Sequence, residues 1–191
     1  FSGSQTIKDT TYFKEFTKQI IGARIVSAER RAKNILIHLD NNLTILIHMK
    51  MTGHLLFGTY TFDTSFPNDP WRAVEPKHLT DPFNRHIRFI LSFDNGKSLA
   101  LSDVRKFAKV TVVPSDTIHT SHHLKDIGPE PLEKKFTFAH FTTRLDLRPR
   151  GKIKQVLMDQ TIIAGIGNIY ADESLWRAYI HPLTLVAAIP P

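Results

Sequence analysis

The hydrophobic pattern of this chain changes near Pro114. Before Pro114, short β-branched runs alternate apolar with polar residues, for example at 43–49 (LTILIHM) and 87–93 (IRFILSF). Successive side chains of a strand point to opposite faces, so this alternation predicts strands with one buried face. After Pro114, apolar residues recur at helical spacing, and the turns contain proline or glycine. The pattern therefore predicts an α+β fold, with strands first and helices after them.

The strand-rich part is expected to be a two-layer antiparallel β-sandwich that spans residues 24–113. Turn-forming residues at 40–42 (DNN) and 94–96 (DNG) separate alternating runs, a combination that is typical of hairpins. One helix is expected before the strands, because apolar residues within 13–20 share a helical face and Gly22 follows them.

Residues 61–85 hold four prolines and show little periodicity. We expect them to form a long loop between strands, and loops of this length are more often functional than average. A boundary is expected within 114–125, between a β-sandwich domain of residues 1–118 and a helical domain of residues 119–191. Helices are predicted in the second domain at 137–147, 151–160 and 167–180.

The 191 residues include 25 lysines and arginines and 18 acidic residues, which gives a formal charge of +7. A basic globular chain favours a polyanionic partner, such as nucleic acid or an anionic membrane surface. The absence of cysteine excludes disulfides and cysteine-ligated metal within this chain. No run approaches the roughly 20 apolar residues of a membrane span, and the first residues show no secretory signal pattern.

A glycine-containing turn followed by a helical pattern lies at 164–173 (AGIGNIYADE). A helix that begins near Asn168 would offer backbone N–H groups to a phosphate, and Gly165 and Gly167 would permit close approach. The same residues also suit a tight turn before a buried helix. The turn is neither a Walker loop nor a dinucleotide fingerprint, because it lacks a following Lys-Ser/Thr pair and a third glycine. From the residues alone, the phosphate-binding and the structural interpretation both stay open.

Five segments, in the same order along the chain, resemble the formamidopyrimidine-DNA glycosylase and endonuclease VIII family. The longest is 157–182 (LMDQTIIAGIGNIYADESLWRAYIHP), which is similar to the helix–two-turn–helix segment of that family. The other four are ERRAKNILIHL, LIHMKMTGHL, SDVRKFAKV and DIGPEPL, which resemble its RRxKYLL, HLxMSGxL, DxRRFG and LGPEPL motifs. The resemblance covers roughly residues 20–183 and is closer to the formamidopyrimidine-DNA glycosylase branch. It implies a β-sandwich domain followed by a helical helix–two-turn–helix domain.

The resemblance implies roles for three residues near the first strands. Lys33 matches the lysine of RRxK, which contacts the phosphate next to the lesion and assists elimination, so Lys33 is the candidate catalytic residue. His48 matches a histidine that contacts a backbone phosphate. Met51 matches the methionine that fills the space left by the extruded base, a use that suits an unbranched, polarizable side chain. Without the resemblance, a solvated lysine, a structural histidine and a core methionine are the ordinary interpretations.

The resemblance places Arg105 and Phe107 in a loop that enters the gap in the duplex. Both side chains would point the same way from extended backbone, because they lie two residues apart. The guanidinium would bond the orphaned base opposite the lesion, and the ring would wedge between its neighbours. A strand with an inward Phe and a surface Arg is the ordinary alternative. His86 in NRHIRF is the candidate DNA-contacting histidine nearby, with His78 in PKHL as a competing match.

Further DNA-contacting residues are expected in the second domain. Arg148, Arg150 and Lys154 belong to a basic run that precedes the glycine-containing turn. Gly167 and Asn168 match the part of the family turn in which backbone N–H groups and an asparagine bind phosphate beside the lesion. A run of lysine and arginine is more often a solvated face, and this interpretation competes with the DNA contact.

The sequence also departs from the family. It contains no PELPEVE-like segment, whose terminal proline is the nucleophile of the family. Lys50 stands where glycine is often found before the methionine, and Ala108 replaces the glycine of RRFG. If that glycine needs positive φ, Ala108 carries strain. We expect a fragment that lacks both ends, with no cofactor in this chain and the zinc of the family in a missing C-terminal finger.

The expected parent is a bifunctional DNA glycosylase and abasic-site lyase of base-excision repair. Its expected partner is duplex DNA that contains an abasic site or an oxidised purine, such as 8-oxoguanine or a formamidopyrimidine, which it would flip out of the helix. The fragment itself is expected to be inactive. We expect a cytoplasmic, bacterial-type, DNA-associated monomer with no membrane partner. The alternatives are a non-enzymatic damaged-DNA-binding homologue without the proline nucleophile and a generic RNA-binding sheet protein.

Overall fold

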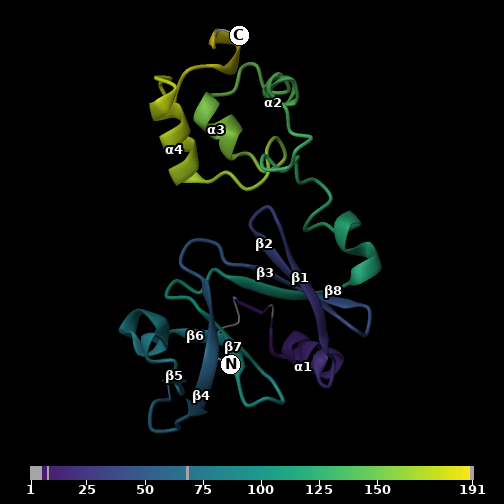
Figure 1. The fold of residues 1–191 in the computed structure, drawn as a ribbon, viewed down its shortest axis with the longest axis vertical. Coiled ribbons are helices and arrows are strands. Elements are labelled where there is room, and N and C mark those ends of the chain that lie inside the picture. The colour runs from purple at the N-terminus through teal and green to yellow at the C-terminus, as the bar shows by residue number, and fades with distance from the viewer. Residues whose placement is uncertain (1–5, 8, 68, 190–191) are drawn as a thin grey trace. The chain divides into compact units, whose positions relative to one another are not determined.

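The computed structural model of the chain describes residues 6–7, 9–67 and 69–189. Its contacts divide the chain into two compact units (Figure 1). We call Phe1–Ala28 with Asn34–Ser115 the sandwich unit, and Glu29–Lys33 with Asp116–Pro191 the helical unit. The contacts therefore separate the units between residues 115 and 116 and assign the tip of the first hairpin to the helical unit.

Two four-stranded sheets build the sandwich unit, in the strand orders β1-β2-β3-β8 and β5-β4-β7-β6. The pairs β2–β3, β3–β8, β4–β5, β4–β7 and β6–β7 are antiparallel. This arrangement confirms the expected two-layer antiparallel sandwich. The strands are β1 (Ile25–Arg31), β2 (Asn34–Leu39), β3 (Leu43–His48), β4 (His54–Phe62), β5 (Trp71–Glu75), β6 (Ile87–Ser92), β7 (Ser98–Ser102) and β8 (Lys109–Pro114).

The core of the sandwich unit combines residues of both sheets with one helix. Ile45 of the first sheet and Leu101 of the second are almost fully buried in one apolar cluster. The helix α1 (Thr10–Ile20) adds Phe16, whose ring meets the ring of Phe89 edge-on with 5.5 Å between centroids. The expected helix is confirmed, and Gly22, with φ of +76°, follows its end.

The expectation of a long loop at residues 61–85 is wrong. β4 continues to Phe62 and pairs with β5, so the segment extends the second sheet. Two short 3-10 helices follow, η1 (Lys77–Thr80) and η2 (Pro82–Arg85). Proline lies just before η1 and at the first position of η2, where no backbone donor is needed. Elements of four or five residues are too short to give a visible periodicity between such prolines.

The helical unit contains the three predicted helices, which Figure 1 shows close together: α2 (Phe138–Leu145), α3 (Ile153–Met158) and α4 (Asn168–Arg177). The hydroxyl of Thr137 caps α2 by accepting from the N–H of His140 at 3.2 Å. All three helices contribute to one apolar cluster, which includes Leu145, Ile153 and Leu175. Two 3-10 segments complete the elements, η3 (Ser115–Thr120) and η4 (Val186–Ala188).

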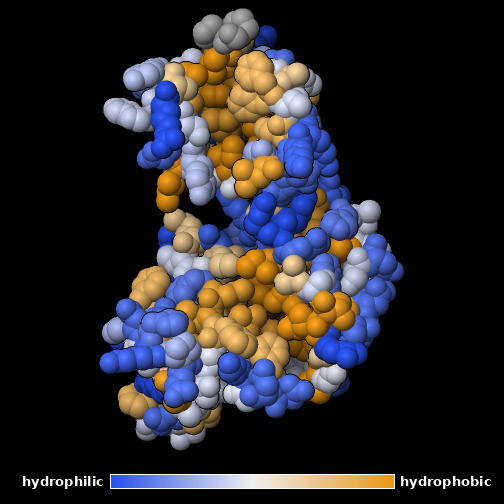
Figure 2. Space-filling model, in the orientation of Figure 1, coloured by the Kyte–Doolittle hydropathy of each residue, from blue (hydrophilic) through white to orange (hydrophobic). Residues whose placement is uncertain are grey.

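An apolar groove of about 640 Å³ opens on one face of the sandwich unit. It lies between α1 and β6, and Phe13, Ile20 and Leu91 are among the residues that line it. Figure 2 shows apolar side chains gathered in a hollow on the displayed face of this unit. Among the described residues, members of the apolar core such as Phe16 and Ile45 line this groove.

Candidate nucleic-acid interface

Gln160 shapes the glycine-containing turn from within. Its Nε2 donates to the carbonyl oxygens of Met158 and Ile166, both at 2.9 Å, and its Oε1 accepts from the N–H of Gly165 at 2.9 Å. Gly165 has φ of +84°, in the left-handed region that favours glycine. The side chain of Gln160 therefore holds the turn in a single conformation. The sequence analysis did not identify this residue, because no spacing rule connects a glutamine with the turn that comes after it.

Lys33 lies at the start of α4. This helix begins at Asn168 with Gly167 as its N-cap, so backbone N–H groups and the positive end of the helix dipole are found here. The Nζ of Lys33 lies 3.3 Å from the position that a Cβ would take on Gly167. Gly167 has an extended φ of −122°, so backbone strain does not require glycine, and a Cβ would need the flexible Lys33 side chain to give by only a few tenths of an ångström. Burial lowers the pKa of the Lys33 ammonium. Three sequence-predicted residues are thus neighbours.

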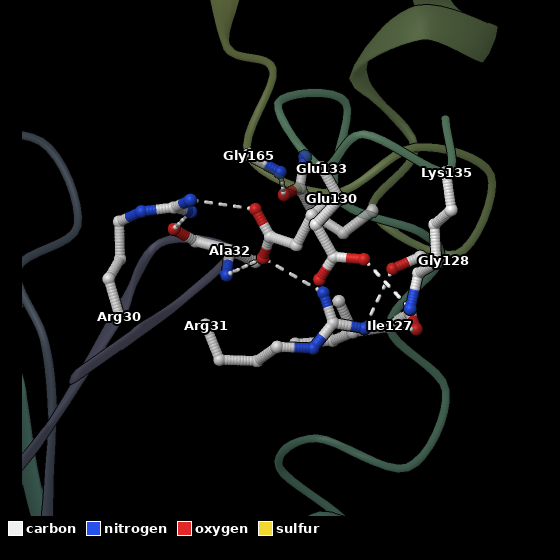
Figure 3. A network of polar contacts seen from close by, with 10 residues as sticks. Arg30, Arg31, Ala32, Ile127, Gly128, Glu130, Glu133, Lys135 and Gly165 are labelled. Atoms are coloured by element: carbon white, nitrogen blue, oxygen red, sulfur yellow. Dashed lines mark hydrogen bonds and ion pairs between the residues drawn. The ribbon is translucent and has the colours of Figure 1, made fainter. Parts of the chain in front are cut away.

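Glu130 holds the hairpin tip that carries Lys33 (Figure 3). Only 7% of Glu130 is exposed, and its carboxylate accepts hydrogen bonds from Arg30 at 2.8 Å and from Arg31 at 2.9 Å. It also accepts from the backbone N–H of Ala32 at 2.6 Å. Burial would raise the pKa of Glu130, but these hydrogen bonds outweigh burial and keep the pKa below its ordinary value. The carboxylate therefore stays charged at neutral pH and fixes the residues next to Lys33.

The linker around Glu130 also bonds the glycine-containing turn. The N–H of Gly128 donates to the carbonyl oxygen of Gln160 at 2.8 Å, and the N–H of Ala164 donates to the carbonyl oxygen of Pro129 at 2.9 Å. Hairpin tip, linker and turn are therefore joined by hydrogen bonds within the helical unit. Sequence analysis identified each segment as a motif but did not predict these contacts, because 98 to 100 residues separate Glu130 from its hairpin partners.

The basic run after α2 contains residues in two different environments. Arg148 and Arg150 are exposed, whereas Lys154 is half-buried. The Nζ of Lys154 lies 2.7 Å from a carboxylate oxygen of Asp172 on α4. A phosphate at Lys154 would compete with this carboxylate for the ammonium. Arg148 and Arg150 are therefore better placed than Lys154 to contact DNA.

Met51, Arg105 and Phe107 meet at the surface of the sandwich unit. Met51 is 71% exposed and Phe107 is 42% exposed, so a core methionine and an inward phenylalanine are wrong interpretations. The Nη1 of Arg105 lies 3.1 Å from the sulfur of Met51. The guanidinium carbon of Arg105 lies 4.7 Å from the centroid of the Phe107 ring, a cation–π distance. The fold brings together a flexible thioether, a cation and an aromatic ring on two exposed loops.

Each of these loops contains a lysine in the left-handed conformation. We call residues 49–53 the Met51 turn and residues 103–108 the Arg105 loop; Lys50 has φ of +57° and Lys106 has φ of +60°. The expected extended backbone between Arg105 and Phe107 is wrong, because Lys106 turns the chain between them. The strain considered for Ala108 is absent, since Ala108 is not among the described residues with positive φ.

The candidate histidines of the sandwich unit lie near these loops. His48 ends β3 and is half-buried, and its Nδ1 accepts from the backbone N–H of Lys50 at 3.0 Å. In the neutral ring this bond places the hydrogen on Nε2, which is the donor that a phosphate requires. The carbonyl oxygen of His86 accepts from the N–H of Asp103 at 2.9 Å, beside the Arg105 loop. His78, the competing match, is exposed on η1.

The described ranges contain neither a candidate metal site nor a candidate membrane span. No group of three or more His, Asp or Glu side chains there is placed to hold a metal ion. The zinc that the resemblance implies has no ligand set among these residues. In the same ranges, no helix has the length and apolar character needed to cross a membrane.

A β-sandwich unit followed by a helical unit, in which a glycine-containing turn precedes α4, is the architecture of helix–two-turn–helix proteins. Residues 2–110 match the family described as formamidopyrimidine-DNA glycosylase N-terminal domain. Residues 127–190 match the formamidopyrimidine-DNA glycosylase H2TH domain. The chain therefore belongs to the formamidopyrimidine-DNA glycosylase family.

Known relatives are longer than this chain. It is 37% identical over 181 residues to a formamidopyrimidine-DNA glycosylase of Herpetosiphon aurantiacus, with 95% of this chain and 58% of that protein covered. It is 40% identical over 183 residues to that of Chloroflexus aurantiacus, with 93% and 56% covered. The chain thus spans little more than half the length of these relatives.

Solved structures of Lactococcus lactis Fpg share the fold. Its complex with DNA that contains an abasic site matches with a TM-score of 0.77 and 28% identity, and covers 99% of this chain and 61% of that chain. Its complex with DNA that contains FAPY-dG matches with a TM-score of 0.77 and 27% identity, over 99% and 63%.

Proposed function

We propose that the parent of this chain is a bifunctional DNA glycosylase and abasic-site lyase of base-excision repair. Its proposed substrates are oxidised purines, such as 8-oxoguanine and formamidopyrimidine, in duplex DNA, on which it acts as a monomer. The related Lactococcus lactis Fpg, solved with abasic-site DNA and with FAPY-dG DNA, supports this choice. The observation that carries the proposal is the exposed cluster of Met51, Arg105 and Phe107.

This cluster has the chemistry needed to occupy a gap in the base stack. Extrusion of a base costs a few kcal/mol of stacking and pairing, and side chains that fill the gap offset this cost. Met51 supplies a flexible apolar side chain, and Phe107 supplies a ring that stacks on a neighbouring base. Arg105 contacts both side chains and carries the donors that bond the edge of the unpaired base.

The start of α4 provides the proposed phosphate grip. Backbone N–H groups at a helix N-terminus, an asparagine side chain and a lysine ammonium are all donors to phosphate oxygens. Lys33 and Asn168 bring these groups together on the exposed side of the turn. Because its pKa is lowered, the Lys33 ammonium releases a proton more easily than an ordinary lysine does. This suits a residue that assists the elimination step next to the bound phosphate.

The chemical steps themselves need a group that this sequence does not contain. In the proposed mechanism the secondary amine of an N-terminal proline attacks C1′ of the sugar, and no PELPEVE-like segment is found here. The chain as given is therefore expected to bind abasic duplex DNA and to leave the glycosidic bond intact. Its proposed contributions are binding of the phosphate backbone and filling of the gap.

Two measurements test the proposal. Fluorescence anisotropy at fixed salt should show that this chain binds a duplex with a stable abasic-site analogue more tightly than an undamaged duplex. Equal affinity for both duplexes, or a preference for single strands, would contradict it. Borohydride trapping of the full-length protein on an 8-oxoguanine duplex should give a covalent adduct. Lesion preference without an adduct would favour the non-enzymatic homologue instead.

A further inference from the structure

Asp103 is a buried carboxylate between the two loops that carry the exposed cluster. It follows β7, has 0% exposure, and uses both of its backbone polar groups. Its N–H donates to the carbonyl oxygen of His86 at 2.9 Å, and its carbonyl oxygen accepts from the Nε of Arg88 at 2.9 Å. The backbone of Asp103 is therefore fixed at the end of the second sheet.

The side chain of Asp103 bonds both loops at once. One carboxylate oxygen accepts from the hydroxyl of Thr52, which directly follows Met51, and from the N–H of Arg105 at 3.1 Å. The other oxygen accepts from the N–H of Ala108 at 2.8 Å. The donors to Asp103 thus lie next to Met51 on one loop, and before and after Phe107 on the other loop.

A carboxylate suits this position better than any neutral side chain. Each hydrogen-bond partner of the Asp103 carboxylate is an N–H or O–H group, so both carboxylate oxygens must accept. An asparagine of the same shape would turn an N–H toward one of these donors and lose at least one bond. Burial would raise the pKa of Asp103, but the donors from Ala108, Thr52, Arg105 and Phe107 outweigh burial and hold the pKa below its ordinary value.

We propose that Asp103 is a positioning residue that joins the Met51 turn and the Arg105 loop into one rigid wedge. The tip of each loop is exposed and passes through a left-handed lysine, so contacts among the tip side chains alone would leave the two loops free to move apart. The shared carboxylate fixes their separation before DNA binds. A wedge that is already formed has less conformational entropy to lose when it enters the base stack. This inference rests on the proposed function.

The test compares affinity for a duplex with a stable abasic-site analogue with affinity for the undamaged duplex. Asp103→Asn should reduce the ratio of the two affinities about tenfold, the lower end of the range for one lost charge-assisted hydrogen bond. Thr52→Val, which removes only the hydroxyl, should reduce the ratio in the same direction. Thr52→Ser, which restores the hydroxyl, should bring the ratio back. A residue that only stabilises the fold would change both affinities together and leave their ratio intact.

Ser102 provides the matched control. It is the neighbour of Asp103, has 0% exposure, and its hydroxyl has no hydrogen-bond partner among the described residues. Ser102→Ala should leave the ratio unchanged within twofold. If Asp103→Asn does not fold, the Thr52 pair decides the question. A normal ratio in folded Asp103→Asn, or in Thr52→Val, would overturn the inference. The absence of any abasic preference in the unmodified chain would instead contradict the proposed function.

Discussion

The Nη1 of Arg105 lies 3.1 Å from the sulfur of Met51, although 54 residues separate them in the sequence. Both side chains are exposed, and the guanidinium carbon lies 4.7 Å from the centroid of the Phe107 ring. Exposed apolar groups that a cation holds in one place favour a binding role over a packing role.

Met51→Ala is expected to leave stability almost unchanged and to weaken abasic-site preference. Met51 is 71% exposed, so its truncation should change the free energy of unfolding by less than about 0.5 kcal/mol. The ratio of abasic to undamaged affinity should fall about tenfold, equivalent to ~1.4 kcal/mol. Urea unfolding and anisotropy measure the two effects. Leu101→Ala, at a fully buried position, is the contrasting variant and should lose about 2–5 kcal/mol. A similar loss for Met51→Ala would indicate that Met51 packs in the core.

Lys33→Gln is expected to weaken binding to every duplex by a similar factor. A lysine that contacts phosphate contributes through counterion release, so its loss should flatten the plot of log K against log salt by about one unit. Binding measured between low and moderate salt gives this slope for both variants. Lys14→Gln removes an exposed charge from α1 and should leave the slope unchanged. An unaltered slope in Lys33→Gln would show that Lys33 does not contact phosphate.

Glu130→Gln is expected to destabilise the helical unit by about 2 kcal/mol, because a buried acceptor for charged donors is lost. The carboxylate accepts hydrogen bonds from Arg30, Arg31 and the N–H of Ala32. The amide of a glutamine at this position can accept from only some of these donors. Chemical denaturation followed by far-ultraviolet circular dichroism reports on helix content, and α2, α3 and α4 belong to this unit. Glu133→Gln is matched in charge and chain position. Its partner Lys135 is exposed, so the change should stay within about 0.5 kcal/mol. Equal effects of the two variants would contradict the anchoring role of Glu130.

The stability of the helical unit should decrease in acid partly because of Glu130. The pKa of Glu130 is lower in the folded than in the unfolded chain. The contribution is therefore complete above the unfolded value of about 4.3 and is lost as pH falls through the folded value. Denaturation curves between pH 7 and pH 3 should show a smaller acid dependence for Glu130→Gln than for the unmodified chain. Parallel curves would show that the carboxylate has the same pKa in both states.

Lys50→Gly is expected to stabilise the sandwich unit. Lys50 has φ of +57°, a conformation that costs a residue with a side chain about 1 kcal/mol and costs glycine little. The free energy of unfolding should rise by up to about 1 kcal/mol, measured by urea denaturation. Lys14→Gly, within the helix α1, should lower it by about the same amount. A loss in Lys50→Gly would mean that the lysine side chain stabilises the Met51 turn.

Local pattern in the sequence was sufficient for most of the elements but not for the candidate residues. Alternation gave β3 and β6, and helical spacing gave α1 and α2, because one buried face imposes a period on residues that are neighbours in the chain. The resemblance then supplied Lys33, Met51 and Asn168 as candidates. The hydrophobic pattern failed at residues 61–85, where elements of four or five residues between prolines show no period.

Contacts between distant residues were decided only by the tertiary structure. Glu130 meets a hairpin about 100 residues away, Asp103 bonds a threonine 51 residues away, and Lys33 lies against Gly167. No periodicity encodes these pairs, since a hydrogen bond requires two groups at one point in space and not at one spacing in the chain. The sequence by itself determined which side chains are candidates for contact with DNA. Only folding determined which of them act together, because the buried carboxylates of Asp103 and Glu130 must collect their donors from whichever segments the fold brings near.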